Sequence, residues 1–135
     1  MFETLTKFID RLENEEICEL EDDGLNDNEE GTIIITHITY KDVVYELEDE
    51  VYNVLDNNPD LVPNNDYMSV IQEYANGDTN KMYGKDTKDM NAKVAFAYIL
   101  STFRAERFYD GAIKSSIEDK RMINWLKKLK EYEEV

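Results

Sequence analysis

Cysteine and histidine each occur only once in this chain of 135 residues, as Cys18 and His37. A single cysteine excludes an internal disulfide and is typical of a reducing compartment, so we expect a cytoplasmic protein. Cys18 lies among Glu15, Glu16 and Glu19, whose negative charges raise the pKa of a thiol. We therefore expect neither a catalytic Cys–His pair nor a metal site built from several such ligands.

Clustered glycines and long apolar runs are also missing. The five glycines stand apart, so the chain has no glycine-rich loop for phosphate groups. No apolar run approaches the ~18 residues of a membrane-spanning helix, and the charged start MFETLTKFID resembles neither a signal peptide nor an anchor. Neighbouring carboxylates such as Asp49 and Glu50 point apart rather than converge. The sequence favours a protein without enzymatic activity or cofactor, although it leaves catalysis open.

Basic residues are scarce in the first half of the chain, whose net charge as a whole is −16. Residues 1–66 contain 20 acidic and 3 basic residues, whereas residues 67–135 contain 11 and 12. An acidic surface repels the phosphates of nucleic acid and attracts basic protein surfaces. We expect a protein partner with a basic surface, no direct binding to nucleic acid and no membrane contact. A solvated acidic surface without a partner is the plainer alternative.

The spacing of apolar residues predicts a mainly α-helical single domain over residues 1–135. We expect about five to six helices and at most one small β element, near residues 32–38. The expected helices are 2–15, a segment starting near Thr39 and Asp42 and ending near Asp56, 66–75, 92–103, 112–118 and 121–132. Thr39 and Asp42 resemble a capping box for the second of these helices.

The stretch from Asn14 to Gly31 holds nine acidic residues and no basic one, which predicts a mobile loop. The β-branched run TIIITHI after it predicts the strand, and its pairing with residues 17–20 as a hairpin remains open. Residues 26–37 imitate the spacing of a calcium-binding loop. His37, however, stands where such a loop needs a bidentate glutamate, so we expect no specific metal site.

The stretch FRAERFYDG interrupts the apolar helix over residues 92–103 with charges. At 100° per residue, Arg107 falls on the face of Phe103, which we expect to be buried, and Arg104 falls on a flank. A buried arginine needs a partner, so Arg107 with Asp110 or Glu106 would fix the angle between two helices.

Other roles for this end of the chain stay open. Arg104, Glu106, Arg107 and Asp110 are candidate ligand-binding residues, with the two arginines holding a carboxylate or phosphate. We expect Gly111 to let another backbone approach. Trp125 and Leu126 are expected in the core, because Met122, Trp125, Leu126 and Leu129 follow helical spacing.

The segment AYILSTFRAERFYDG resembles domain-of-unknown-function family 6508, a group of small bacterial and phage-associated proteins. Arg104, Glu106, Arg107, Phe108, Asp110 and Gly111 match its R-x-E-R-F-x-[DE]-G pattern. The segment MINWLKKLKEY is similar to the closing helix of the family, so the resemblance covers mainly residues 91–132, with a fainter likeness in the first half. It implies a mainly helical domain, with Phe108 and Gly111 as parts of the structural motif, but implies no activity. Lys120 stands where the family usually has glycine.

Together these observations favour a non-enzymatic cytoplasmic interaction module that uses an acidic surface. The alternative is a domain, or a cryptic enzyme, that binds a small anionic ligand through Arg104 and Arg107. A homodimer through the near-neutral C-terminal half is a further alternative.

Overall fold

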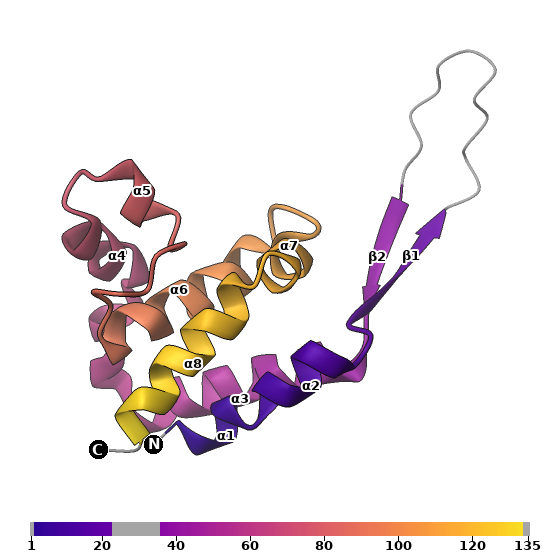
Figure 1. Cartoon of the computed structure of the whole chain (residues 1–135), viewed down its shortest axis with the longest axis horizontal. Helices are drawn as coiled ribbons and strands as arrows, with labels where there is room; N and C mark the ends of the chain where they lie inside the picture. The colour runs from indigo at the N-terminus through magenta and orange to yellow at the C-terminus, as the bar shows by residue number, and fades with distance from the viewer. Residues whose placement is uncertain (1, 23–35, 134–135) are drawn as a thin grey trace, which may run out of the picture.

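The computed structural model describes residues 2–22 and 36–133, and most of these residues are helical (Figure 1). The elements are α1 (Glu3–Thr6), α2 (Phe8–Asn14), β1 (Cys18–Asp22), β2 (Thr36–Tyr40), α3 (Asp42–Asn57), the 3-10 helices η2 (Pro59–Leu61) and η3 (Pro63–Asn65), α4 (Tyr67–Ala75), α5 (Thr79–Met82), α6 (Ala92–Ala105), α7 (Ala112–Glu118) and α8 (Arg121–Glu133). Six of the described α-helices have seven residues or more. The mainly α fold with one small β element is confirmed.

Helix α6 is the centre of the helical body. All seven residues from Val94 to Leu100 are buried, because α3, α4, α7 and α8 contact the helix from different sides. A helix that is apolar nearly all round has to be covered in this way. The apolar helix expected over residues 92–103 is therefore confirmed.

Helix α3 and the N-terminal helices cover one side of this centre. Val44, Leu47 and Val51 are buried, as the helical spacing predicts. The prediction of a capping box at Thr39 and Asp42 is wrong. Thr39 belongs to β2, and α3 begins after Lys41 without a side-chain cap. Residues 3–14 form two successive helices, α1 and α2, rather than the expected single one.

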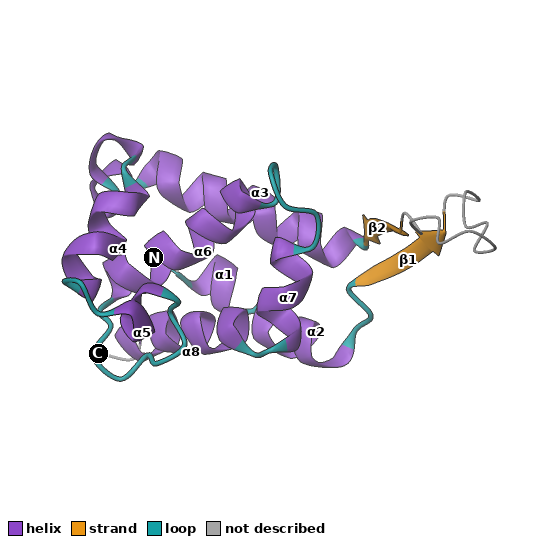
Figure 2. Ribbon diagram, turned by 90° about the horizontal axis from the view of Figure 1, so that it is seen from above, coloured by secondary structure: helices purple, strands orange, loops and turns teal. Residues whose placement is uncertain are grey.

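Strands β1 and β2 form an antiparallel pair that projects from the helical body (Figures 1 and 2). Cys18 lies opposite Tyr40, and Glu21 lies opposite His37. The sequence left open whether the predicted strand pairs with residues 17–20, and the structure shows this hairpin as β1 paired with β2. The expectation of a loop throughout residues 14–31 is wrong for residues 18–22, because pairing with β2 satisfies their backbone groups. Asn14 of that stretch belongs to α2, whereas residues 23–31, and most of the calcium-like segment, lie outside the described residues.

The segment between α4 and α6 packs its backbone closely against aromatic rings. Asn76 ends α4 in the left-handed conformation, at φ +46°. Gly84 has φ +66°, and a Cβ atom there would lie 3.0 Å from both Trp125 Cζ2 and Tyr98 Cδ1. Glycine is the residue that fits this position.

The turn between α7 and α8 contains the position where family 6508 usually has glycine. Lys120 adopts φ +72° there, and its N–H donates to the Ile117 carbonyl at 3.1 Å. The tight turn is retained with lysine in a conformation that glycine adopts more easily. Across the described residues, no helix combines the length and the apolar character needed to cross a membrane.

Candidate functional site

Helix α6 ends at Ala105, before most of the charged residues that the sequence singled out. The N–H groups of Phe108 and Tyr109 both donate to the Ala105 carbonyl at 2.9 Å, which forms the turn toward α7. Gly111, at φ +100°, opens α7. A projection at 100° per residue therefore does not apply beyond Ala105.

Glu106 holds this turn together through its half-buried carboxylate. Its Oε2 accepts the Gly111 N–H at 2.7 Å, and its Oε1 accepts the Ile113 N–H at 2.8 Å. The same Oε1 accepts the Tyr40 hydroxyl of β2 at 2.5 Å. Hydrogen bonds to an ionised carboxylate are stronger than those between neutral groups. One side chain thus joins α6, α7 and the hairpin.

Tyr40 completes this connection from the hairpin side. Its hydroxyl also accepts the Lys114 N–H at 3.2 Å. Burial, and then the hydrogen bond to Glu106, raise the pKa of Tyr40 well above its usual value. We call Tyr40, Glu106 and the three N–H groups of residues 111, 113 and 114 the hairpin anchor.

Gly111 allows a close approach beside the hairpin anchor, although the approaching group differs from our expectation. A Cβ atom at Gly111 would lie 3.0 Å from Ile38 Cδ1 of β2. The neighbour is a side chain rather than a backbone. Because φ is positive there, a larger residue would be strained as well.

Arg107 is exposed, so the prediction that it lies on the buried face is wrong. It forms no ion pair with Asp110 or Glu106 in the described structure, and Asp110 is exposed too. Phe108 is 84% exposed, so it is not part of the packed interior. The physical reason is the early end of α6, which turns these side chains outward. Among the candidates, Glu106 joins the helices instead.

Arg104, expected on an outer flank, is half-buried instead. Its guanidinium carbon lies 5.6 Å from the centre of the Tyr52 ring on α3, within the range of a cation–π contact. Two atoms here, Arg104 Nε and the Tyr52 hydroxyl, are buried without a hydrogen-bond partner among the described residues. Arg107 lies near enough to α3 to lower the pKa of Glu48, which burial and Asp49 raise more strongly.

Trp125 and Leu126 lie in the core, as the helical spacing predicts. Trp125 is 1% exposed, and its ring stacks on Tyr98 at a centroid distance of 5.4 Å. Its Nε1–H donates to the Gly84 carbonyl at 2.9 Å. Trp125 therefore has a structural role in the core, through both its ring and its N–H group.

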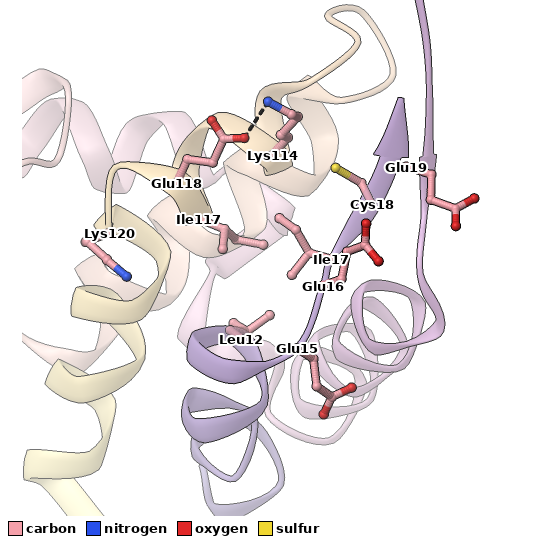
Figure 3. Close-up of a pocket in the computed structure, with 10 residues that line it drawn as sticks. All are labelled: Leu12, Glu15, Glu16, Ile17, Cys18, Glu19, Lys114, Ile117, Glu118 and Lys120. Carbon is pink, nitrogen blue, oxygen red and sulfur yellow. Dashed lines mark ion pairs between the residues drawn. The ribbon is translucent and has the colours of Figure 1, made fainter. Parts of the chain in front are cut away.

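A hollow of about 780 Å³ lies at the base of the hairpin, between α2, β1 and α7 (Figure 3). Leu12, Ile17 and Ile117 point toward one another there, and Lys114 pairs with Glu118 at the rim. Cys18 also lines it, and burial is the main cause that raises the pKa of its thiol. A thiol of this kind is a poor nucleophile. The expected direction of the shift holds, but its main cause is burial rather than the neighbouring acids.

Acidic side chains surround the same hairpin base. We call Glu15, Glu16, Glu19, Asp42 and Glu46 the acidic collar. Arg11 bonds Glu15 and Glu46, each at 2.8 Å, and Lys41 bonds Glu19 at 2.6 Å. Glu16 and Asp42 are exposed and form no ion pair within the described structure. Five acids against two cations leave this surface negative.

The hairpin anchor includes a residue that the sequence did not single out. Tyr40 is 66 positions from Glu106, and no local spacing relates the two residues. An aromatic residue two positions after the predicted strand of residues 32–38 was its only signal. In the described part of the chain, no group of three or more histidine, cysteine, aspartate or glutamate residues is arranged to hold a metal ion.

Comparison with known families places the chain in one of them. The model of the Family of unknown function (DUF6508) matches residues 1–135, so the chain belongs to this family. The match is wider than the resemblance over residues 91–132 and spans the acidic stretch as well. No curated protein and no solved structure matches the chain.

Proposed function

We propose that this member of the DUF6508 family is a non-enzymatic interaction module whose acidic N-terminal half binds a basic surface of a protein partner. The observation that carries the proposal is the projecting hairpin, which rises from the acidic collar and is fixed at its base by the hairpin anchor (Figure 1). An element that stands away from the body reaches a partner without interference from the helices.

Charge supports this choice of partner. Glu16 and Asp42 are exposed and form no ion pair within the described residues, so their side chains are accessible to a partner. Acidic groups of one sign accelerate the encounter with a basic surface and disfavour acidic competitors. The 20 acids and 3 bases of residues 1–66 extend this field over the whole half.

The hairpin anchor supports the proposal in a second way. A two-stranded hairpin is marginally stable alone and needs packing against other elements. Four hydrogen bonds join Tyr40 and Glu106 to each other, to Gly111 and to the first turn of α7. Since a fixed element loses less conformational freedom on binding, the anchor lowers the cost of association.

The test compares two variants with the same loss of charge. In pull-downs from host lysate at low and high salt, the wild type should retain specific partners only at low salt. Glu16→Gln with Asp42→Asn should lose them, whereas Glu73→Gln with Asp89→Asn, two exposed acids of the C-terminal half, should retain them. The proposal fails if no partner is sensitive to salt, or if both variants lose the partner equally.

A second candidate function is the binding of a small anion, such as a carboxylate or phosphate, by Arg104 and Arg107. One observation favours it. The Arg104 Nε atom and the Tyr52 hydroxyl are two buried donors that lack partners in the described structure. A buried donor without a partner costs free energy, which a bound oxyanion would recover.

This second candidate is tested with inorganic phosphate. The melting temperature should rise with phosphate but not with chloride at equal ionic strength, and Arg107→Ala should abolish the rise. Because Arg107 is exposed, the variant should fold normally. An equal rise in the variant, or none in the wild type, would remove this candidate.

The proposal also includes the cellular compartment and the origin of the protein. The single cysteine suits a reducing compartment, and we place the protein in the cytoplasm. The resemblance over residues 91–132 supports a bacterial origin, with a phage or another mobile element as the source.

A further inference from the structure

A groove of about 340 Å³ is lined by residues of α4, α5, α6, α7 and α8. Met68, Met82 and Tyr83 line it, and Tyr83 is 65% exposed. Tyr98 and Trp125 also contribute to its lining. The hydrogen bonds of Tyr98 and Trp125 to the carbonyls of residues 81 and 84 fix this wall.

Two aromatic side chains protrude beside this groove. Phe108 is 84% exposed and Tyr109 is 73% exposed, and both belong to the turn between α6 and α7. Ala105, just before the turn, and Ala112, just after it, both line the groove. Large exposed apolar side chains next to one another mark interaction surfaces. An apolar protrusion and an apolar groove thus adjoin on one chain.

The charges of this surface decide which partner fits. Among the described residues that line the groove, Arg121 is the only charged one, and its Nε donates to Asp119 at 2.7 Å. The C-terminal half is nearly neutral, whereas the whole chain carries −16. Two copies can therefore meet at this side without bringing their acidic halves together.

We propose that this surface binds a second copy of the chain. In a two-fold symmetric dimer the same patch serves both copies, so a patch needs a protrusion and a groove that complement each other. Phe108 and Tyr109 of one copy enter the groove of the other, and the exchange is reciprocal. The hairpin of each copy projects on the far side of α7 from α4 and α5, whose residues Met68 and Met82 line the groove (Figure 1). The dimer is independent of the interaction proposed for the acidic half.

Sedimentation velocity over a range of concentrations tests this proposal. The wild type should form dimers, and higher salt should strengthen them by screening the acidic halves. Phe108→Ser with Tyr109→Ser should raise the dissociation constant by at least about 100-fold, since aromatic anchors dominate interface energy. Tyr132→Ser, which removes a 46% exposed aromatic residue near the end of α8, is the matched control. It should leave the dimer unchanged.

A groove variant separates this arrangement from other dimers. Met82→Glu should weaken the dimer as strongly as the double serine variant. An equal mixture of the two variants should recover part of the association, because one intact protrusion then meets one intact groove. A wild type that stays monomeric would overturn the proposal, as would dimers weakened by salt. Dimers that tolerate Met82→Glu, or a mixture without recovery, would also overturn it.

Discussion

Two segments of this molecule, the base of the hairpin and residues 81–84, are held by side chains that bond to backbone groups. At the hairpin anchor, the Glu106 carboxylate accepts two N–H groups and the Tyr40 hydroxyl. At the segment 81–84, Trp125 and Tyr98 donate to two backbone carbonyls instead. The first arrangement uses a charged acceptor, and the second uses neutral donors on large rings.

The difference shows how each segment contributes to stability. The aromatic pair combines its hydrogen bonds with extensive burial, since Trp125 and Tyr98 are 1% and 4% exposed. The carboxylate buries little apolar surface, and its contribution lies in satisfying three donors at once. Substitutions at the two places should therefore differ in size and in dependence on pH.

The largest effect is expected for Trp125→Ala. The change removes the stacked ring and leaves a cavity in the core, so the free energy of unfolding should fall by about 3–5 kcal/mol. Urea denaturation followed by circular dichroism measures it. Tyr132→Ala, at a 46% exposed aromatic residue on the same helix, should cost less than about 1 kcal/mol. Equal losses would contradict the assignment of Trp125 to the core.

Glu106→Gln should have the next largest effect. The amide keeps one accepting oxygen, so the N–H of Gly111 or the donors of Tyr40 and Ile113 lose their acceptor. An unsatisfied donor costs about 1–3 kcal/mol. Hydrogen exchange should accelerate in β1 and β2 while the core of α6 stays protected. Asp110→Asn, at an exposed acid in the same turn, should change neither the free energy of unfolding nor the hydrogen exchange of the hairpin.

The helices of the core could be predicted because burial follows a local period. Val44, Leu47 and Val51 recur at helical spacing on α3, and the structure buries all three. The run from Val94 to Leu100 is apolar enough to demand cover on every side. In both segments, the spacing of apolar residues over a few helical turns is enough to predict which side chains are buried.

The hairpin anchor could not be predicted in this way. Its main contact joins Tyr40 and Glu106, which are 66 residues apart, and such a pairing leaves no periodic trace. The helical projection failed for Arg107 because it assumed that α6 continues, whereas the helix ends at Ala105. The charges that interrupt the apolar run and the family resemblance both drew attention to this turn, but neither showed which charged side chain bonds to which group.

The third prediction concerns alkaline pH. Burial raises the pKa of Tyr98 to about 12, whereas an unfolded tyrosine titrates near 10. The contribution of the buried Tyr98 hydroxyl to the free energy of unfolding is fully present below pH 10. It is lost as the pH rises toward 12, because the tyrosine of the unfolded chain releases its proton first. Tyr98→Phe should therefore reduce the decline of unfolding free energy above pH 10, by up to about 1.4 kcal/mol per pH unit. Urea denaturation at pH 9, 10 and 11 measures this slope.

Tyr40→Phe extends the comparison to the hairpin anchor. Burial and the bond to Glu106 raise the pKa of Tyr40 as well, so its removal should reduce the same slope. The variant should also accelerate hydrogen exchange in the hairpin at neutral pH, whereas Tyr98→Phe should not. Slopes identical to wild type in both variants would contradict the burial of the two hydroxyls.

The smallest effects are expected at the two arginines, and they reverse the order that the sequence predicts. Arg104→Ala should cost about 1 kcal/mol, because the guanidinium packs over the half-buried Tyr52 ring. Arg107→Ala should cost less than about 0.5 kcal/mol, since the side chain is exposed and forms no ion pair in the described structure. Urea denaturation of both variants under identical conditions measures the difference. A larger loss for Arg107→Ala would restore Arg107 as the residue that joins the helices, because only a partnered, buried arginine destabilises strongly on removal.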